Sequence, residues 1–116
     1  IVDDKDGTPT YTHDFAKTVK ELIKNEYWGL YNCVCGGQTS RLEVAQELLK
    51  ILGKENEIKI TTVSSDFFKE VYFAERPASE RLITKKLDLR GVNQMRDWKV
   101  ALKEYIENYY IGYLDK

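Results

Sequence analysis

The sequence predicts a small α/β domain of three-layer-like architecture, with short, mostly parallel strands and about four helices. Helical stretches with one apolar stripe alternate along the chain with short runs rich in β-forming residues. The 116 residues are 42% hydrophobic and 32% charged, as is typical of one globular domain with a modest core. No repeat, low-complexity segment or internal linker divides the chain, so residues 1–116 are expected to form a single domain.

The first predicted elements are a short strand at residues 1–3 and a helix between residues 11 and 26. Apolar side chains in the helix recur at i, i+4, i+7 and i+8, which places them in one stripe. They are Phe15, Val19, Leu22 and Ile23. Thr10 or Thr12 is expected to cap the start of this helix, because a side-chain oxygen there can accept from free backbone N–H groups.

The clearest element follows a run rich in β-formers, "WGLYNCVCGG", which predicts a buried strand ending at residues 36–37. Ser40 and Glu43 then form an S-x-x-E capping box, and Gly53 stands where a helix C-terminal cap is expected. Between them lies an apolar stripe of Ala45, Leu48, Leu49 and Leu52.

The second half of the chain predicts shorter elements. Alternation over residues 58–63 indicates a strand, Ser64 or Ser65 caps a brief helix around 67–71, and 82–84 is strand-like. A helical turn is expected near residues 85–89, and the final helix begins near Asp97. One face of that helix carries Trp98, Ala101, Leu102, Tyr105, Ile106 and Tyr109, and the tail beyond residue 110 is expected to fray.

Charge and hydropathy exclude two classes of partner. The net charge is −1 and basic residues are scattered among acids, which disfavours binding to a nucleic acid backbone. No apolar run approaches the roughly 20 residues of a membrane span, and no signal peptide precedes the first helix, so a cytoplasmic protein is expected. A leader peptide that has been removed remains an open alternative. The sole methionine is Met95, which predicts a fragment of a longer chain or a processed protein.

The sequence carries no set of residues that predicts catalysis. Cys33 and Cys35 are two apart, which suits small apolar side chains on one face of a strand better than a disulfide. With His13 the only histidine, no four-ligand zinc site can be assembled. Glycine-rich nucleotide loops and a G-x-S-x-G motif are lacking, and Gly36-Gly37 alone is weak evidence for a phosphate site. We therefore expect no catalytic residue, bound metal or bound cofactor in this chain alone.

Four segments, in order, resemble the dTDP-4-dehydrorhamnose reductase family of extended short-chain dehydrogenases. "VDDKDGTPTYTHDFAKTV" resembles V-D-D-Q-x-G-S-P-T-Y-T-x-D-L-A, and "GLYNCVCGGQTSRLEVAQEL" is similar to G-x-Y-H-x-x-G-x-G-x-x-S-W-Y-E-F-A. "ERPASERLITKKL" resembles R-P-x-N-S-x-L-x-x-x-K-L, and "DWKVALKEYI" is similar to D-W-x-x-A-L-x-x-Y-L. The resemblance runs from residue 2 to about residue 109.

The resemblance implies that this chain is the C-terminal, sugar-nucleotide-binding lobe of a Rossmann-type reductase that makes dTDP-L-rhamnose for polysaccharide synthesis. In that family NADPH is bound by an N-terminal Rossmann lobe, whose Tyr-x-x-x-Lys pair is absent here because no tyrosine has a lysine four residues later. The parent is then an enzyme and this chain alone is inactive. The implied partners are the dTDP-sugar substrate, the N-terminal lobe and, as an open alternative, a second copy.

The resemblance also assigns candidate substrate contacts to Thr8, Pro9, Thr10 and Arg76. For the first three, an equally weighted alternative is that Pro9 only sets the start of a helix. Arg76 could bind a diphosphate with its guanidinium group, the interpretation we favour, or pair with a surface acid. For Asp4 and Lys5, at the family's D-Q step, a solvated turn is favoured over a ligand contact.

Departures from the family pattern leave a second function class open. Ser79-Glu80 stands where Asn-Ser is usual, Asn32 replaces the common His, and Arg41-Leu42 replaces Trp-Tyr. The same superfamily includes a regulatory subunit of methionine adenosyltransferase, so a non-catalytic, protein-binding relative is the alternative. A lobe separated from its partner should also leave apolar surface uncovered and self-associate.

Overall fold

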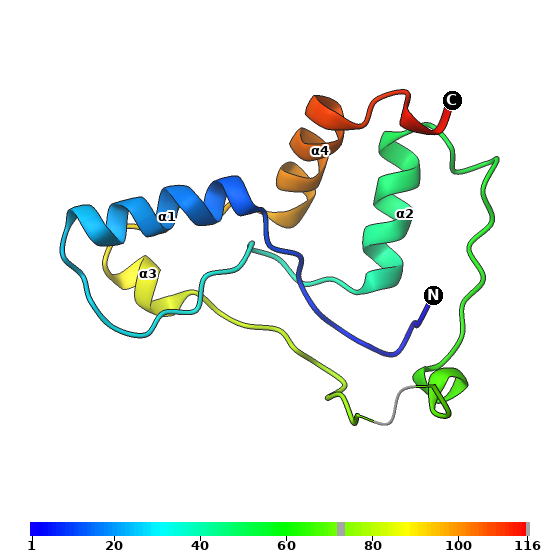
Figure 1. Ribbon diagram of the computed structural model, residues 1–116, viewed down its shortest axis with the longest axis horizontal. Helices are drawn as coiled ribbons and strands as arrows, with labels where there is room; N and C mark the ends of the chain where they lie inside the picture. Colours follow the sequence, from blue (N-terminus) through cyan, green and yellow to red (C-terminus); the bar gives the residue numbers. More distant parts are fainter. Residues whose placement is uncertain (72–73, 116) are drawn as a thin grey trace.

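The computed structural model describes residues 1–71 and 74–115, which contain four α-helices. Long extended segments join these helices (Figure 1). The prediction of about four helices is therefore confirmed. Two short 3-10 helices, η1 and η2, complete the elements. In chain order these are α1 (Thr12–Lys24), α2 (Arg41–Ile51), η1 (Ser65–Phe68), α3 (Lys85–Leu89), α4 (Trp98–Tyr109) and η2 (Tyr113–Asp115).

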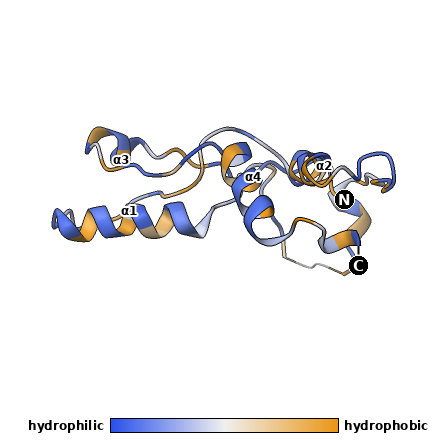
Figure 2. Cartoon of the chain, turned by 90° about the horizontal axis from the view of Figure 1, so that it is seen from above, coloured by the Kyte–Doolittle hydropathy of each residue, from blue (hydrophilic) through white to orange (hydrophobic). Residues whose placement is uncertain are grey.

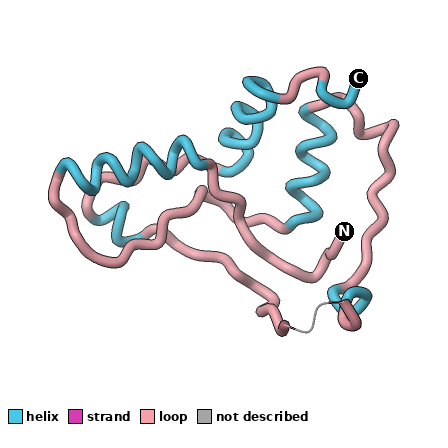
Figure 3. The backbone as a smooth tube through the Cα atoms, viewed as in Figure 1, coloured by secondary structure: helices cyan, strands magenta, loops and turns pink. Residues whose placement is uncertain are grey.

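The predicted strands are extended segments that pair only through isolated bridges, so Figure 3 draws the described chain as helices and loops. Three bridges are parallel, Val2 with Val63, Asp6 with Ser79 and Gly36 with Asp97, and Asp6 also forms an antiparallel bridge with Ser40. The expected strands at 1–3, 28–37 and 58–63 each supply one bridging residue. The prediction of a strand-like piece at residues 82–84 is wrong, because none of these four bridges involves those residues.

Helix α1 begins close to the predicted position, but its buried face is polar. The N-cap residue is Tyr11, with no side-chain cap, so capping by Thr10 or Thr12 is wrong. The buried residues are Asp14 and Thr18, whereas Phe15 in the predicted apolar stripe is 42% exposed. Polar contacts determine which face of α1 is buried, because the Thr18 hydroxyl donates to the Asp14 carbonyl and accepts from the backbone N–H of Gln94.

Helix α2 has the start and the end that its sequence predicts. The Ser40 hydroxyl accepts from the backbone N–H of Glu43, whose carboxylate accepts in return from the Ser40 N–H, which completes the capping box. At the other end Gly53 adopts φ of 66°, and the N–H of Lys54 donates to the carbonyl of Leu49. This Schellman arrangement satisfies carbonyls that the last turn leaves free.

The core lies where α4 meets α2 and the start of α1. The predicted start of the final helix near Asp97 is confirmed, and the Asp97 carboxylate caps α4 by accepting from the backbone N–H of Lys99 at 2.9 Å. The buried cluster consists of Tyr11, Cys35, Trp98 and Ala101, with Val44, Met95 and Leu102 packed against it. Of the predicted apolar face of α4, Trp98, Ala101 and Ile106 are buried, while Tyr105 and Tyr109 are 38% and 55% exposed.

Two contacts from distant residues hold the short helices in place. Both Asp4 carboxylate oxygens accept from the backbone N–H of Ser65 at 3.1 Å, so Asp4, and not a serine, caps η1. Lys54 Nζ lies 2.8 Å from Asp115 Oδ1, which ties η2 to the end of α2. Residues 113–115 are therefore ordered by a helical turn where a frayed tail was expected.

The molecule is flat and open, with extents of 47 × 36 × 19 Å. Its radius of gyration is 16.7 Å, against about 13 Å for a compact domain of this length. Its accessible surface is 8649 Å², against about 6,600 Å² for a folded monomer of this mass. Figure 2 colours parts of α1 and α3 as hydrophobic, and Phe15, Ile23 and Leu89 in these helices are 42%, 57% and 77% exposed. The chain therefore leaves uncovered a surface comparable to a large protein interface.

Across the described ranges, no helix has the length and apolarity needed to cross a bilayer.

Candidate sugar-nucleotide-binding site

Three segments from distant parts of the chain meet at Asp6. Its backbone N–H donates to the carbonyl of Ala78 at 2.9 Å, and its carbonyl accepts from the N–H of Glu80 at 3.0 Å. On the other side the N–H of Gly7 donates to the carbonyl of Thr39 at 3.0 Å. We call residues 5–8, 37–40 and 76–81 the Asp6 junction.

The predicted contact residue Thr8 lies within this junction. Its hydroxyl donates to the carbonyl of Gly37 at 3.1 Å, and the residue is half-buried. Pro9 is also half-buried and Thr10 is exposed, one residue before the N-cap of α1. The stretch therefore both leads into the helix and borders the junction, as each interpretation requires.

Arg76 reaches the same junction through its backbone. Lys5 Nζ donates to the Arg76 carbonyl at 2.8 Å, so the two residues lie together although 71 positions separate them. The Arg76 side chain is 75% exposed, and its Nη1 lies 3.6 Å from Glu80 Oε1. This ion pair is the contact that the alternative interpretation expects, and an exposed pair of this kind contributes little to stability. The guanidinium group remains accessible to a ligand.

Arg81 is a second cation in the junction, and sequence reasoning did not single it out. Its Nη1 donates to Gln38 Oε1 at 2.8 Å and its Nε to Ser79 Oγ at 2.9 Å, while Nη2 lies 3.8 Å from Asp6 Oδ2. One side chain thus joins all three segments. Its position five residues after Arg76, in the segment that carries the family resemblance, is the signal that could have found it.

Arg96 organises a second polar cluster that holds α1 against α4. Its Nε and Nη2 donate to the Asp14 carboxylate, which is 1% exposed, and its Nη1 donates to Glu104 Oε2. The Tyr11 hydroxyl donates to the other Glu104 oxygen at 3.3 Å. Hydrogen bonds from Arg96 lower the pKa of Glu104, and hydrogen bonds to both acids raise that of Arg96. This cluster is structural, since its groups satisfy one another.

The lowered carboxylate pKa values predict a loss of stability in acid. Hydrogen bonds from Arg96 lower the pKa of Glu104, and hydrogen bonds from Ser65 lower the pKa of Asp4. Both carboxylates therefore bind protons less readily in the folded chain than in the unfolded chain. Their stabilisation is complete above the ordinary values of about 4 and is lost as the pH falls through the folded values. The melting temperature should hold from pH 7 to about 5 and then fall.

Thermal melts of Glu104→Gln across this range should show a flatter acid limb than the original chain. Glu107→Gln is the matched control, because Glu107 on the same helix is exposed and lies 3.7 Å from Lys103. An acid limb unchanged by Glu104→Gln would contradict the assignment.

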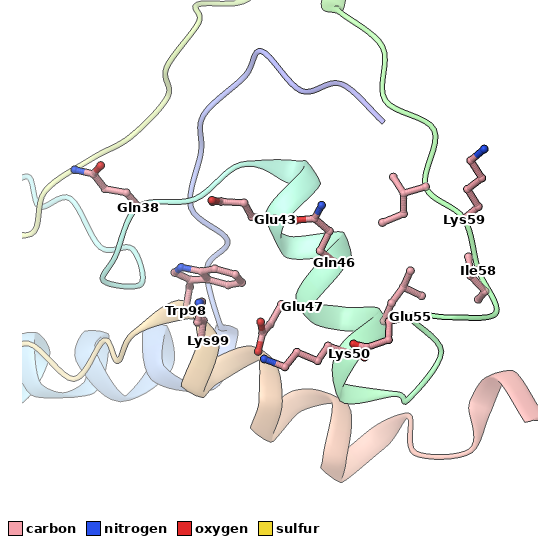
Figure 4. Close-up of a pocket in the computed structure, with 12 residues that line it drawn as sticks. Gln38, Glu43, Gln46, Glu47, Lys50, Glu55, Ile58, Lys59, Trp98 and Lys99 are labelled. Carbon is pink, nitrogen blue, oxygen red and sulfur yellow. The ribbon is translucent and has the colours of Figure 1, made fainter.

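An open cavity of about 640 Å³ lies beside the junction, with which it shares Gln38, between α2, the start of α4 and residues 55–60 (Figure 4). Its charged lining mixes acids and lysines, namely Glu43, Glu47, Glu55, Lys50, Lys59 and Lys99. None of the predicted contact residues lines it. Three carboxylates among three ammonium groups offer no net attraction to a diphosphate, so we place the candidate site at the Asp6 junction and not in this cavity.

Gly36 and Gly37 serve packing in this structure. A Cβ on Gly37 would lie 2.8 Å from both Asp97 Oδ2 and Trp98 Cδ1, and φ there is +90°. The pair lets the chain pass close to the start of α4, where the N–H of Trp98 donates to the carbonyl of Gly36.

Within residues 1–71 and 74–115, no group of three or more His, Cys, Asp and Glu side chains could hold a metal ion. Cys33 and Cys35 are free thiols whose pKa values are raised by burial.

Comparison with known proteins gives a family model and several relatives. The model of the RmlD substrate binding domain matches residues 1–111. The spore coat polysaccharide biosynthesis protein SpsK of Bacillus subtilis is 31% identical over 107 residues, covering 92% of this chain and 36% of that protein.

Solved structures give the same result. A dTDP-4-dehydrorhamnose reductase from Clostridium acetobutylicum is 33% identical with a TM-score of 0.85, over 93% of this chain and 37% of that one. The enzyme from Bacillus anthracis, solved with NADP, is 25% identical with a TM-score of 0.81, over 94% and 37%. The chain thus spans little more than a third of the length of these relatives, and the similarity confirms the predicted fold class.

Proposed function

Because the chain belongs to the RmlD substrate binding domain family, we propose that it is the substrate-binding lobe of a dTDP-4-dehydrorhamnose reductase. The reaction proposed for the longer protein is reduction of dTDP-4-dehydro-L-rhamnose to dTDP-L-rhamnose, with NADPH as reductant. Residues 1–116 would act as one unit in it. The relative named for spore coat polysaccharide biosynthesis supports a role in supplying polysaccharide precursors. We also propose that the longer protein is cytoplasmic.

The observation that carries the proposal is the arrangement of donors at the Asp6 junction. The junction places two guanidinium groups, those of Arg76 and Arg81, beside the segment that contains Thr8. These parts of the chain are distant in sequence and are joined by hydrogen bonds. A guanidinium group can bind two phosphate oxygens at once, and a dTDP-sugar presents a diphosphate. The carboxylates of Asp6 and Glu80 lie close to these two guanidinium groups and offset their positive charge. A diphosphate would compete with these carboxylates for the arginines.

The residues of this chain do not fit NADPH. No G-x-G-x-x-G sequence is present, and the Gly36-Gly37 pair packs against Trp98, so this pair forms no dinucleotide cradle. We therefore assign the cofactor to another part of the longer reductase and place no chemical step on this chain. Its contribution is to bind the nucleotide and hold the sugar in a fixed orientation, which lowers the entropic cost of the reaction.

Titration with dTDP tests the proposal directly. Backbone amide resonances of residues 5–8, 37–40 and 76–81 should shift together as dTDP is added in the millimolar range. Arg76→Gln and Arg81→Gln should each weaken binding about tenfold, since each removes a charge-assisted hydrogen bond to phosphate. Arg41→Gln, on the exposed start of α2, is the matched control and should bind like the original chain.

Two outcomes would overturn the assignment. Shifts confined to residues 43–60 and 98–99, which line the cavity beside α2, would move the site away from the Asp6 junction. No shift at any residue with millimolar dTDP would remove nucleotide binding from this chain and favour the protein-binding alternative.

A further inference from the structure

A group of aromatic residues near the end of α4 forms a second hollow, apart from the Asp6 junction. Its volume is about 530 Å³, within the range of small-molecule sites. We call it the aromatic pocket, and it is lined by Tyr11, Thr12, His13, Tyr105, Tyr109, Tyr110 and Tyr113. Five of these seven residues are tyrosines contributed by the segment entering α1, by α4 and by the turn that follows it. Nothing in the proposed reductase function uses them.

Most of the rings are inclined to one another and form walls, although Tyr11 and His13 stack with planes 22° apart. Tyr105 and Tyr109 have ring centroids 5.6 Å apart and planes inclined by 49°, and Tyr110 and Tyr113 are 5.5 Å apart at 78°. His13 and Tyr109 meet at 84°. A planar heterocycle needs parallel faces on both sides, whereas a roughly spherical group can contact several inclined faces at once. The geometry therefore suits a compact, rounded ligand.

The charges around the pocket favour a cation. Among the described residues, none of those that line it is a lysine, arginine, aspartate or glutamate. The Tyr11 hydroxyl donates to Glu104, whose negative charge is paired with the positive charge of Arg96. The pocket also surrounds the C-terminal end of the 12-residue helix α4, where the helix dipole is negative. Neutral tyrosine rings present negative faces, and the hydroxyl of Tyr105 is held by that of Tyr110 at 3.1 Å.

We propose that the aromatic pocket binds a quaternary ammonium group. Such a cation is held by the faces of several tyrosines, carries no N–H that needs a hydrogen-bond acceptor, and loses little hydration on entering. The proposal is independent of the sugar-nucleotide site, because none of the residues of the Asp6 junction lines this pocket.

Choline and its neutral isostere 3,3-dimethyl-1-butanol test whether charge drives binding. The two probes have the same shape, but only choline is a cation. Titrated into the full 116-residue chain and followed by the ring resonances of its tyrosines, choline should bind in the millimolar range at least fivefold more tightly than the alcohol. Equal binding of the two probes would show that the pocket is merely apolar, and absence of choline binding would also overturn the proposal.

Substitutions separate the ring faces from the hydroxyl groups. Tyr109 and Tyr113 are 55% and 60% exposed, so their replacement should leave the melting temperature unchanged. The double substitution Tyr109→Leu with Tyr113→Leu should weaken choline binding about tenfold, whereas Tyr109→Phe with Tyr113→Phe should retain it. Phe67→Leu, which removes a 70% exposed ring elsewhere, is the control. Loss in the Phe variant equal to that in the Leu variant would contradict recognition by ring faces.

Discussion

Replacing Arg96 by alanine should destabilise the fold by about 3 kcal/mol, because the buried Asp14 carboxylate would lose its charged partner. Asp14 is 1% exposed and accepts from two guanidinium nitrogens, Nε at 3.0 Å and Nη2 at 2.9 Å. Removal of one partner of a buried pair costs about 3–5 kcal/mol, and we take the low end because the Arg96 side chain is 36% exposed. For a chain of this size the melting temperature should fall by roughly 12 °C.

Arg41→Ala is the control for this prediction. Arg41 lies on the exposed start of α2, and its replacement should change the melting temperature by less than about 2 °C. Adding Asp14→Asn to Arg96→Ala should recover part of the loss, since a neutral amide is less costly to bury than an unpaired carboxylate. Equal melting temperatures for Arg96→Ala and Arg41→Ala would show that the buried ion pair does not hold α1 to α4.

The isolated chain should self-associate through an apolar surface beside α3. Leu30, Ile83 and Leu89 are 89%, 72% and 77% exposed, and we call them the α3 patch. Their segments lie together, because Lys86 Nζ donates to the Leu30 carbonyl at 3.1 Å and the Asn32 amide donates to the carbonyl of Ile83. Contiguous apolar surface of this kind is typical of an interface. In the proposed reductase the rest of the protein would cover it.

Light scattering coupled to gel filtration measures this effect. The original chain should elute as a dimer or larger species at about 100 μM, within the micromolar-to-millimolar range where exposed apolar surface associates. The triple variant Leu30→Lys, Ile83→Lys, Leu89→Lys should elute as a monomer with an unchanged melting temperature. The control, Phe67→Lys with Val71→Lys, removes two 70% exposed apolar side chains elsewhere and should still associate. A monomeric original chain would contradict the prediction.

The sequence predicted best those features that depend on neighbouring residues. The Ser40–Glu43 capping box, the Gly53 end of α2 and the start of α4 near Asp97 all involve partners within a few positions. Each rests on local backbone geometry, which a single sequence carries in its spacing. The family resemblance was confirmed for the same reason, since it depends on short motifs in order.

Features that depend on long-range contacts were missed. The apolar stripe of α1 predicted a face that the structure leaves partly exposed, because the burial of Asp14 depends on Arg96, 82 residues later. Likewise Asp4 caps η1 across 61 residues, where a serine in the adjacent sequence was expected to do so. Isolated bridges in place of strands follow from the open shape, since each extended segment has too few neighbours to build a ladder. The contact roles of Thr8, Pro9, Thr10 and Arg76 remain predictions.

The bridges of the N-terminal segment also constrain the order in which the chain acquires its structure. Val2 pairs with Val63, and Lys5 with a carbonyl 71 positions further on. Closing such long loops costs entropy before any contact compensates for it, so these pairings are intrinsically slow to form. During synthesis, residues 1–6 must wait until the stretch around Arg76 has been made before they are held. The beginning of this chain is therefore among the last parts to fold.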